Sequence, residues 1–575
     1  MGSKIIEMPN GQKGFSSRKT LAEERFIKTE EFDKNGLLTK FEFNNIPRNF
    51  NFSYDVIDVL AKKIPDKPAL LYYSDSCEKM FTFEEISKLS NQAANYFNDI
   101  GIKSGDKVLV EVRSNYQFWI IFAALHKVGA IMIPNSFLSS ADDLVHKITT
   151  ANVSHIIASD KAHVLEEFDR AFAHKGIAGM IKNKLLTNAT NLDDGWESFD
   201  DNLVKYSDSF ERIQTNVDDP MIIFFTSGTT NRPKMVVHTY SYPLAHIATA
   251  KYWQNVQPDE YNFIIADRAW AFSAGGGTYG QWLMESPNLI YDYERFDSAA
   301  VDKAWRLIEK NKVSAIAAST PIYSLLLKGL NDLLARGEEI DLSHLKNCAG
   351  AGQALPKQLL DEFYKKTGVK IRNALWQTET IPEFCIQASD KNIDTSIGTK
   401  LPFFDIEVLK ENGEAAGVGE LGEICIRHKN HTQIGLFKGY ANNPEANAKI
   451  FDDEYYHTGD WAYKTNDGHW NFHGRMDSLI KASGYRIAPE EVEEALNTHP
   501  AIKDCRVYGE AMDNGDTQLV ADVTIKKGVI WTSELEKEIK NYVAELTTAY
   551  KKPRKFNVCS EIPRTITGKI MRKAI

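Results

Sequence analysis

The sequence predicts an α/β protein with a large N-terminal domain of layered α/β subdomains and a small α+β C-terminal domain. Its 575 residues exceed what one hydrophobic core normally supports. From about residue 50 to about residue 350, apolar helical stretches alternate with short β-rich runs, which is typical of layers built on largely parallel sheets. After Gly474 this pattern changes.

The strands of the N-terminal domain are predicted from short apolar, β-branched runs at 108–112, 155–158, 222–225, 262–266 and 315–318. The most apolar stretch covers 118–125 and 128–133 and is interrupted by His126 and Lys127. It is too short to span a bilayer, so it predicts a buried helix followed by a buried strand.

The segment 401–430 contains two strand-like runs separated by glycine-rich turns, which predicts a small β-rich subdomain. The C-terminal region alternates helix and strand patterns, with predicted helices over 489–496 and 533–545 and predicted strands over 505–508 and 519–525.

These patterns divide the chain into three expected parts. Residues 1–50 are polar and are expected to form an N-terminal surface extension. Residues 51–473 form the main domain, and residues 474–575 form the C-terminal domain.

Net charge and the arrangement of the cysteines exclude several classes of protein. The chain has 68 Lys and Arg against 78 Asp and Glu, a net charge of −10, which argues against a general nucleic-acid or membrane-surface protein. The 6 cysteines form no CxxC pair, so the sequence indicates neither a zinc site nor a disulfide framework and fits a reducing compartment. The N-terminus shows no secretory or myristoylation signal, so we expect a cytoplasmic protein. The oligomeric state is left open.

The strongest local motif is MIIFFTSGTTNRPK at 221–234. An apolar strand runs directly into hydroxyls, a glycine and a lysine. That order presents backbone N–H groups, O–H donors and a positive charge to a polyphosphate. The Walker pattern GxxxxGK is absent. The alternative is a Ser/Thr-rich hairpin turn.

Further motifs follow in order along the chain. LWQTE at 375–379 places a hydroxyl beside a carboxylate, a pair suited to holding Mg²⁺ on phosphates. YHTGD at 456–460 ends in an acid that can accept two hydrogen bonds from a ribose diol, and GRMDSLIK at 474–481 supplies a cation. PRTITGK at 563–569 offers a lysine on a glycine-containing loop. Each is ordinary alone, but their number and order argue against chance.

Together these motifs resemble the adenylate-forming superfamily of acyl- and aryl-CoA synthetases, luciferases and peptide-synthetase adenylation domains. Within it, YGQW at 279–282, GLFKGY at 435–440 and YKKPRK at 550–555 look like the short- and medium-chain acyl-CoA synthetases. The resemblance covers about residues 50–575 and is less specific for the substrate than for the superfamily.

The resemblance implies an AMP-forming acyl-CoA synthetase that uses ATP, Mg²⁺ and coenzyme A. In such enzymes a carboxylate attacks the α-phosphate of ATP to give acyl-AMP and pyrophosphate, and the thiol of coenzyme A then displaces AMP. The C-terminal domain rotates between the two half-reactions, so this domain is expected to be mobile.

Matching positions carry the family roles onto this chain. Lys569 would bridge the attacking carboxylate and the α-phosphate, Thr378 would contact the α-phosphate, and Arg475 would support ribose and phosphate. Glu379 would bind Mg²⁺, and Asp477 matches the hinge. The other expected ATP-binding residues are Thr226, Ser227, Gly228, Thr229, Thr230, Lys234, Gly352, Gln353, Asn373, Trp376, Gln377 and Asp460.

Coenzyme A is the expected partner of the basic final segment. Ser483, Gly484 and Tyr485 match the loop that enters beside the thiol channel in the family. Lys552 and Arg554 lie in the Lys- and Arg-rich stretch 551–572, which we interpret as a binding site for the phosphates of coenzyme A. A nucleic-acid patch is the alternative interpretation.

The acyl pocket is expected at Trp270, Phe272, Gly277 and Trp376. Acetyl- and propionyl-specific relatives carry Trp at the position of Trp376, and medium-chain relatives carry Gly. An indole fills the volume of several methylenes, so Trp376 favours a short-chain or short branched carboxylic acid. Against this, the YGQW motif looks like the medium-chain branch, and the glycine run 275–277 could open space elsewhere. A medium-chain or aromatic acid is the alternative.

Several positions depart from the family pattern. They are Asn231 in the phosphate loop, Gln353 and Ala354 near the adenine position, Leu375 where an aromatic residue commonly stacks, and Ser478 after the hinge. They leave two alternatives to an active acyl-CoA synthetase. One is a catalytically weakened nucleotide-binding homologue, and the other is an enzyme that loads a carrier-protein thiol or makes only acyl-AMP.

Overall fold

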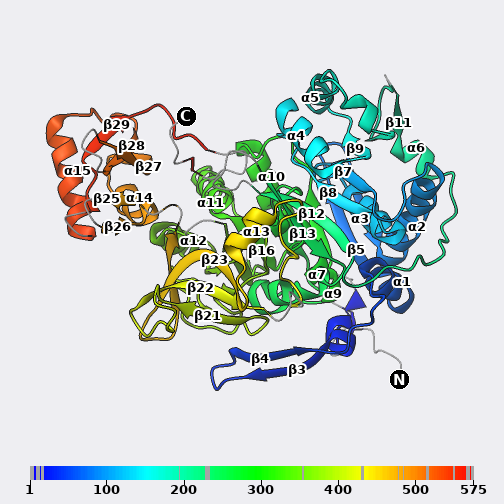
Figure 1. The fold of residues 1–575 in the computed structure, drawn as a ribbon, viewed down its shortest axis with the longest axis horizontal. Helices are drawn as coiled ribbons and strands as arrows, with labels where there is room; N and C mark the ends of the chain where they lie inside the picture. Colours follow the sequence, from blue (N-terminus) through cyan, green and yellow to red (C-terminus); the bar gives the residue numbers. More distant parts are fainter. Residues whose placement is uncertain are drawn as a thin grey trace. The chain divides into compact units, whose positions relative to one another are not determined.

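The computed structural model describes most of the chain. The described residues are 6–7, 13–14, 19–192, 195–226, 233–352, 355–428, 433–476, 478, 480–482, 485–512, 517–547, 551–564 and 570–571. The chain forms two compact units. Unit 1 comprises Met1–Asp405 with His428–Lys449, and unit 2 comprises Ile406–Arg427 with Ile450–Ile575. The predicted α/β class is confirmed (Figure 1).

The first sheet of unit 1 is parallel except at β13, which pairs antiparallel with β12. Its strands, in sheet order, are β11 (Trp196–Ser198), β10 (Asn183–Thr187), β9 (His155–Ser159), β7 (Lys107–Glu111), β8 (Ile131–Pro134), β12 (Pro220–Thr226) and β13 (Lys234–Thr239). Because β8 and β12 are parallel, their carboxyl ends reach the same edge of the sheet, which is where the hydroxyl-rich motif begins.

The second sheet of unit 1 is parallel in its middle and antiparallel at both edges. Its strands, in sheet order, are β20 (Thr399–Lys400), β19 (Phe384–Cys385), β18 (Ile371–Leu375), β17 (Asn347–Ala351), β16 (Ala315–Ser319), β14 (Asn262–Ile265), β15 (Asn288–Tyr291), β5 (Pro68–Tyr73) and β6 (Glu78–Thr82). The LWQTE motif therefore starts at the carboxyl end of β18.

Helices pack around these sheets (Figure 1). The α-helices are α1 (Asp58–Lys63), α2 (Phe83–Asp99), α3 (Gln117–Val128), α4 (Ala141–Ala151), α5 (Ala162–Phe172), α6 (Phe199–Leu203), α7 (Tyr242–Ala245), α8 (Ala271–Ala274), α9 (Tyr279–Leu283), α10 (Ser298–Lys310), α11 (Thr320–Ala335), α12 (Lys357–Thr367) and α13 (Pro444–Ile450). Shorter turns are the π-helices η1 (Ala22–Phe26), η2 (Ser53–Ile57) and η4 (Ala248–Gln254) and the 3₁₀-helix η3 (Ala178–Met180).

Local sequence explains where the helices begin and end. Helix α2 starts with a capping box in which the Thr82 hydroxyl accepts from the Glu85 amide and the Glu85 carboxylate accepts from the Thr82 amide. Helix α3 ends at Gly129, whose φ of +78° places it in the left-handed region that glycine adopts without strain. Every residue of α3 is buried, as expected for a helix that is apolar on all sides. Among the described helices, none combines the length and apolarity needed to cross a membrane.

Unit 2 has its own sheets and core. Its strands are β21 (Asp405–Leu409), β22 (Leu421–Arg427), β23 (Tyr455–Lys464) and β24 (Trp470–Arg475) in one sheet, β25 (Ile480–Ala482) and β26 (Tyr485–Ile487) in a second, and β27 (Ile502–Ala511), β28 (Thr517–Ile525) and β29 (Lys555–Val558) in a third. Helices α14 (Pro489–Asn497) and α15 (Ser533–Leu546) supply Val492, Leu496, Ile539 and Val543 to a core shared with β27 and β28.

The first fifty residues contain more structure than a polar extension. Ile6–Glu7 (β1) pairs with Lys13–Gly14 (β2), and Ile27–Phe32 (β3) pairs with Leu38–Phe43 (β4) as an antiparallel hairpin, drawn in dark blue in Figure 1. Leu38 and Phe41 of this hairpin are buried. The division at residues 50 and 474 stays a prediction.

Close packing of α10 against α11 gives a test of the fold. A Cβ at Gly329 would lie 2.2 Å from Val301 Cγ1. Gly329→Ala should therefore destabilise unit 1 by roughly 1–3 kcal/mol, because overpacking outweighs the helix propensity gained. Denaturant unfolding measures the change. Gly179→Ala is the control, since its Cβ would meet nothing within 4 Å. Equal stability of both variants would contradict the packing.

Candidate active site

The hairpin formed by β12 and β13 starts the site. Thr226 at the end of β12 pairs in register with Lys234 at the start of β13, so both lie where the loop that joins the two strands begins and ends. Ser227, Gly228, Thr229 and Thr230 lie between them, outside the described residues. The predicted phosphate motif is thus anchored on two adjacent strands.

A tyrosine connects the lysine of this hairpin to the carboxylate of the LWQTE motif. Lys234 Nζ lies 4.7 Å from the centre of the Tyr440 ring, and the Tyr440 hydroxyl donates to Glu379 Oε1 at 2.7 Å. The Phe437 amide donates to the Glu379 carbonyl at 2.9 Å, which ties the GLFKGY segment to the same turn. Glu379 is buried, and the hydroxyl that holds its carboxylate belongs to the same tyrosine that receives the Lys234 cation on its ring.

A buried histidine positions Thr378. His238 Nε2 donates to the Thr378 carbonyl at 2.7 Å. Burial lowers the pKa of His238 to about 4, with the bond to Thr378 acting in the opposite direction, so the ring is neutral and its Nε2–H is the donor. The turn that follows is closed by the Gln377 amide, which donates to Thr380 Oγ1 at 3.0 Å. Thr378 and Glu379 therefore occupy a turn fixed from two sides.

The other predicted nucleotide contacts lie at the carboxyl ends of β17 and β18. Gly352 has a φ of +93°, and a Cβ there would meet nothing within 4 Å, so the backbone conformation and not crowding selects glycine. Asn373 is buried, and its Nδ2 donates to the Ser396 carbonyl at 3.1 Å. Gln353 lies outside the described residues.

Three aromatic rings pack together where the acyl pocket is predicted. Trp376 stacks on Phe272 with ring centres 5.7 Å apart and meets Trp253 edge-on at 5.0 Å. Trp376, Phe272 and Trp270 are partly exposed, whereas Trp253 is fully buried. The side chains of Trp376, Phe272 and Trp270 therefore reach accessible space, and buried Trp253 packs against Trp376 and Phe272.

The glycine run 275–277 brings backbones close together. A Cβ at Gly275, Gly276 or Gly277 would lie 2.7, 2.8 and 2.6 Å from neighbouring atoms. These glycines therefore allow the segment after α8 to pack tightly against α8, η4 and β14, and they leave no free volume at their own Cβ positions.

In unit 2, Asp460 and Arg475 face each other across β23 and β24. They are register partners, and Arg475 Nε lies 3.8 Å from Asp460 Oδ1. Asp460 is buried, and its amide donates to Thr458 Oγ1 at 3.0 Å. Arg475 Nη2 donates to the Thr458 carbonyl at 3.3 Å, while about half of the arginine side chain is exposed. The pair thus presents an ordered carboxylate beside an accessible cation.

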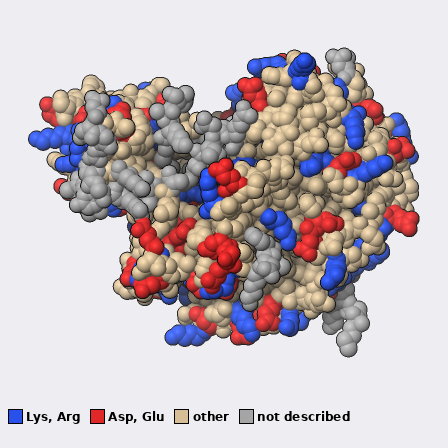
Figure 2. All heavy atoms as spheres, in the orientation of Figure 1, with Lys and Arg blue, Asp and Glu red and all other residues tan. Residues whose placement is uncertain are grey.

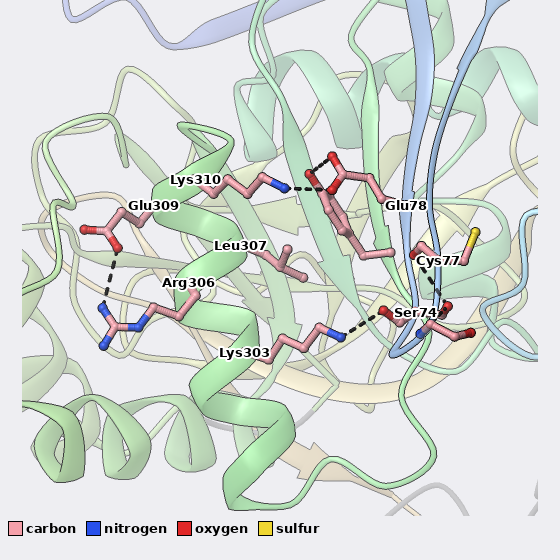
Figure 3. A pocket seen from close by; sticks show the side chains of 10 residues that line it. Ser74, Cys77, Glu78, Lys303, Arg306, Leu307, Glu309 and Lys310 are labelled. Carbon is pink, nitrogen blue, oxygen red and sulfur yellow. Dashed lines mark hydrogen bonds and ion pairs between the residues drawn. The ribbon is translucent and has the colours of Figure 1, made fainter.

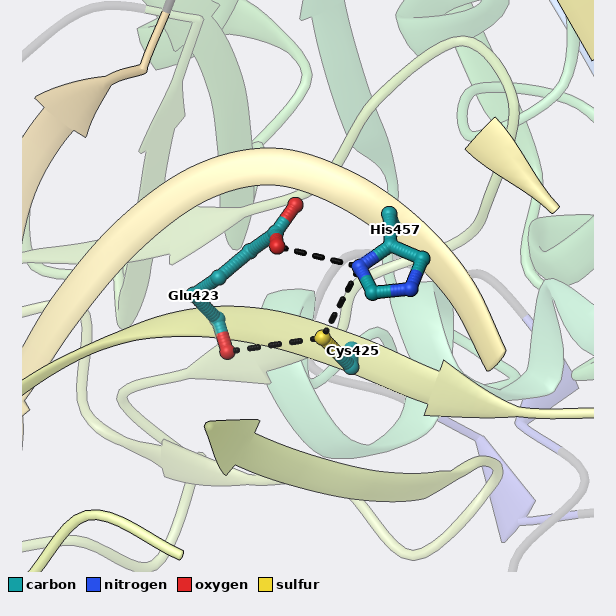
Figure 4. Close-up of side chains that lie close together, drawn as sticks. All are labelled: Glu423, Cys425 and His457. Carbon is teal, nitrogen blue, oxygen red and sulfur yellow. Dashed lines mark hydrogen bonds and ion pairs between the residues drawn. The ribbon is translucent and has the colours of Figure 1, made fainter. Parts of the chain in front are cut away.

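Glu423, Cys425 and His457 lie close together (Figure 4) and hold the part of β23 just before Asp460, where the register with β22 shifts. His457 Nδ1 lies 3.0 Å from Glu423 Oε2 and 3.6 Å from Cys425 Sγ, and Nε2 lies 3.0 Å from Asp452 Oδ2. Glu423 Oε1 also accepts from the Gly459 amide at 3.0 Å. The cluster therefore connects strand β22 directly to the backbone of the TGD turn.

His457 is positively charged in this cluster. Its contacts with Cys425, Glu423 and Asp452 raise its pKa to about 11, against the opposing effect of burial. The donor atoms of Glu423, Cys425 and His457 lie within 4.8 Å of one another, a set of ligand types that zinc accepts. Because both ring nitrogens face carboxylates, however, the protonated ring is favoured, and an imidazolium has no lone pair for a metal.

The predicted coenzyme A residues are only partly described. Lys552 and Arg554 are exposed, and Tyr485 begins strand β26. In the same basic segment Lys551, Lys555 and Arg564 pair with Glu491, Glu510 and Asp504 at 2.5, 2.9 and 2.7 Å. Acids from other strands and helices thus offset part of its charge. Lys569, Asp477, Ser483 and Gly484 lie outside the described residues.

A separate cavity of about 630 Å³ lies between α10 and the turn joining β5 to β6 (Figure 3). Its cations are paired with acids: Lys310 with Glu78 at 2.7 Å and Lys303 with Asp75 at 2.9 Å. None of the predicted site residues lines it.

This fold and this arrangement of motifs define an adenylate-forming enzyme. Residues 57–441 match the family described as AMP-binding enzyme, and residues 491–569 match the AMP-binding enzyme C-terminal domain. The chain belongs to the AMP-binding enzyme family, as its motifs predict.

Similar proteins cover nearly the whole chain. The human acyl-coenzyme A synthetases ACSM2B and ACSM3, both named as mitochondrial, are each 29% identical to it over 92% of this chain and 90% of their own. Among solved structures, the anthranilate CoA ligase AuaEII in complex with anthranoyl-AMP has a TM-score of 0.78 and 23% identity, covering 91% of this chain and 96% of its own. A benzoate CoA ligase from Burkholderia xenovorans LB400 has a TM-score of 0.76 and 21% identity, covering 91% and 98%. These two structures share the fold.

Sequence reasoning did not find three residues that organise the site. Tyr440 lies in the GLFKGY motif, but its contacts with Lys234 and Glu379 bridge segments far apart in the chain. His238 follows the phosphate motif on β13, and an alternating strand pattern gives no sign that it reaches Thr378. His457 lies inside the YHTGD motif, where only its neighbours Thr458 to Asp460 suggested a role.

The charge on His457 predicts a pH dependence for unit 2. A raised pKa means that the protonated ring stabilises the fold fully below the unfolded value of about 6.5. This stabilisation is lost as pH rises toward about 11. Thermal unfolding of wild type and His457→Gln should therefore differ most near pH 6 and converge toward pH 10. A difference that stays constant over this range would contradict the charged cluster.

Proposed function

We propose that the chain is an AMP-forming acid–thiol ligase. It activates a short-chain or short branched carboxylic acid with ATP to acyl-AMP and then transfers the acyl group to coenzyme A. The observation that carries the proposal is the meeting of Lys234, Tyr440 and Glu379 beside the hydroxyl-rich hairpin. The names of the human relatives, acyl-coenzyme A synthetases, support it.

In the first half-reaction the chain's task is to hold ATP and stabilise moving negative charge. Thr226, the loop 227–230 and Lys234 would bind the β- and γ-phosphates, with Lys234 aimed by the face of Tyr440. Thr378 would bind the α-phosphate from the turn that His238 fixes. Backbone and side-chain donors already in place cost little reorganisation as the carboxylate attacks.

Glu379 would hold Mg²⁺. Its carboxylate is buried, and Tyr440 donates to only one of its oxygens. A carboxylate beside a threonine hydroxyl is an oxygen donor set of the kind that Mg²⁺ prefers, so these residues fit the ion. Mg²⁺ bound there would offset phosphate charge.

Asp460 would accept hydrogen bonds from the ribose hydroxyls, and Arg475 would support ribose and phosphate. Gly352, Gln353, Asn373, Trp376 and Gln377 would complete the nucleotide site. In the second half-reaction the loop with Ser483, Gly484 and Tyr485 would approach the thiol, and Lys552 and Arg554 would receive phosphates of coenzyme A. The C-terminal domain would start at residue 474. Its movement about Asp477 would switch the enzyme from the arrangement that forms acyl-AMP to the one that forms the thioester.

Trp270, Phe272, Gly277 and Trp376 would wall the acyl pocket. The stacked Trp376 and Phe272 rings occupy space that a longer chain would need, which supports a short acid. A medium-chain or aromatic acid is the second candidate, because two proteins of the same fold are named as anthranilate and benzoate CoA ligases.

The proposal extends to partners and compartment. Lys and Arg are interspersed with Asp and Glu on the face shown in Figure 2, which supports the prediction that nucleic acid is not a partner. A cytoplasmic location remains a prediction, since the human relatives are named as mitochondrial. Subcellular fractionation separates the two locations.

The direct test is a panel of straight, branched and aromatic acids assayed with ATP, with and without coenzyme A. We expect AMP and thioester to form together with short acids. ATP binding without acid-dependent pyrophosphate release would identify a weakened nucleotide-binding homologue. Acyl-AMP without thioester would point to an enzyme that serves another thiol.

Lys569→Ala should separate the half-reactions. Loss of the cation between carboxylate and α-phosphate should reduce acyl-adenylate formation by at least about 100-fold, because stabilising groups of this kind contribute that much. Thioester formation from supplied acyl-AMP should stay close to wild type. Equal loss in both half-reactions, measured separately, would refute the role of Lys569.

Trp376→Gly should lengthen the acids that the enzyme accepts. Removing the indole opens room for several methylenes, and each well-packed methylene changes kcat/KM by roughly 10- to 200-fold. The KM for ATP is measured in the same assays, because Trp376 is also a predicted contact of the nucleotide. An acid profile identical to that of wild type would show that Trp376 does not limit the pocket.

A further inference from the structure

The N-terminal segment from Leu21 to Phe43 packs against unit 1 through its hairpin. Phe41 of β4 stacks on Phe403 with ring centres 4.0 Å apart and contacts Tyr252 edge-on at 6.1 Å. The Leu38 amide donates to Gln387 Oε1 at 2.8 Å, and Ser389 Oγ donates to the Gly36 carbonyl at 2.6 Å. The hairpin is therefore docked by both apolar and polar contacts.

The docked segment contacts one short helix, the π-helix η4 (Ala248–Gln254). Lys251 Nζ lies 2.8 Å from Glu23 Oε1 and 2.7 Å from Glu30 Oε1, and the Tyr252 hydroxyl donates to Glu30. These groups are mostly buried, with side-chain exposures of 19% for Lys251 and 21% for Glu30. Screening by water is weak there, so these contacts fix η4 more firmly than a surface ion pair does.

The next residues of η4 form the back of the predicted acyl pocket. Trp253 is fully buried, its Nε1 donates to the Arg372 carbonyl at 3.1 Å, and its ring meets Trp376 at 5.0 Å. Gln254 Nε2 donates to the Gly276 carbonyl at 3.2 Å, at the glycine run beside Phe272. Consecutive residues of one helix thus contact the N-terminal segment and the pocket wall. π-Helical turns often occur at functional sites.

We propose that the N-terminal hairpin is a specificity-determining brace of the acyl pocket. Glu30 and Lys251 act as positioning residues: they hold η4, which holds Trp253 against Trp376 and so limits the length of the acid. The inference rests on the proposed function and on the assignment of the acyl pocket to Trp376 and Phe272. Packed aromatic groups adjust in discrete steps, so loosening η4 should open room for at least one methylene.

The test compares two double variants of the full chain. Glu30→Gln with Lys251→Met removes the ion pairs of Lys251 with Glu23 and Glu30. Glu31→Gln with Lys40→Met is the matched control, because it removes the same kinds of group from an exposed pair at 3.0 Å on the same hairpin. For each, kcat/KM is measured with saturated acids of increasing length, together with the KM for ATP.

We expect the brace variant to raise the ratio of kcat/KM for longer over shorter acids by roughly tenfold or more, the effect of one methylene of extra room. The KM for ATP and the control's profile should stay at wild-type values. An unchanged profile in a folded brace variant would overturn the proposal, and so would the same shift in the control.

Two further measurements keep the test decisive. If the brace variant does not fold, Tyr252→Phe, which removes only the hydrogen bond to Glu30, is measured in its place, with the same outcomes required. In a Trp376→Gly background the brace substitutions should add nothing to the shift in acid-length preference, because both changes act on the same wall of the acyl pocket. An additive shift would contradict an effect of the hairpin that passes through η4 to Trp376. Failure of wild type to activate any acid would instead refute the proposed function.

Discussion

The proposed active site needs a cation and a carboxylate that lie close to the same phosphates without neutralising each other. Tyr440 separates them: its ring face receives the Lys234 ammonium at 4.7 Å, and its hydroxyl donates to Glu379 at 2.7 Å. A direct Lys–Glu pair in a buried site would satisfy both charges and leave little for a ligand. Because each group contacts a different part of Tyr440, both would keep capacity to bind ATP and its metal ion as proposed.

Around this group, residues of the proposed site are held in place by neighbouring residues. Strands β12 and β18 belong to different sheets, and each pairs in parallel with a neighbour in its own sheet. They deliver the phosphate motif and the LWQTE motif at their carboxyl ends, and neutral His238 and the Phe437 amide fix the turn that holds Thr378 and Glu379. In unit 2 the Glu423 and His457 cluster fixes the turn before Asp460 in an analogous way. The residues proposed to contact the nucleotide are thus held by others that have no such proposed contact.

Much of the fold and the site could be predicted from sequence because local patterns determine them. The runs predicted as strands at 108–112, 155–158 and 315–318 match β7, β9 and β16 to within one residue at each end. An apolar, β-branched run between two helices usually forms a buried strand, so its position can be predicted. The motifs predicted the family for the same reason. Contacts between distant segments could not be predicted: Tyr440 with Glu379, and Glu30 with Lys251, join residues that no periodicity connects. The prediction of a surface extension at 1–50 did not include the burial of Phe41. The overall composition of this segment is polar, and composition alone does not show which few apolar side chains are buried.

The central claim is that the acid attacks the α-phosphate of ATP. The most direct measurement uses a carboxylic acid labelled with heavy oxygen in its carboxyl group and follows the label by mass spectrometry after turnover with ATP and coenzyme A. The account predicts that one labelled oxygen appears in AMP and none in pyrophosphate, because acyl transfer to the thiol leaves that oxygen on the α-phosphorus. Unlabelled AMP, or label released in inorganic phosphate together with ADP, would contradict it.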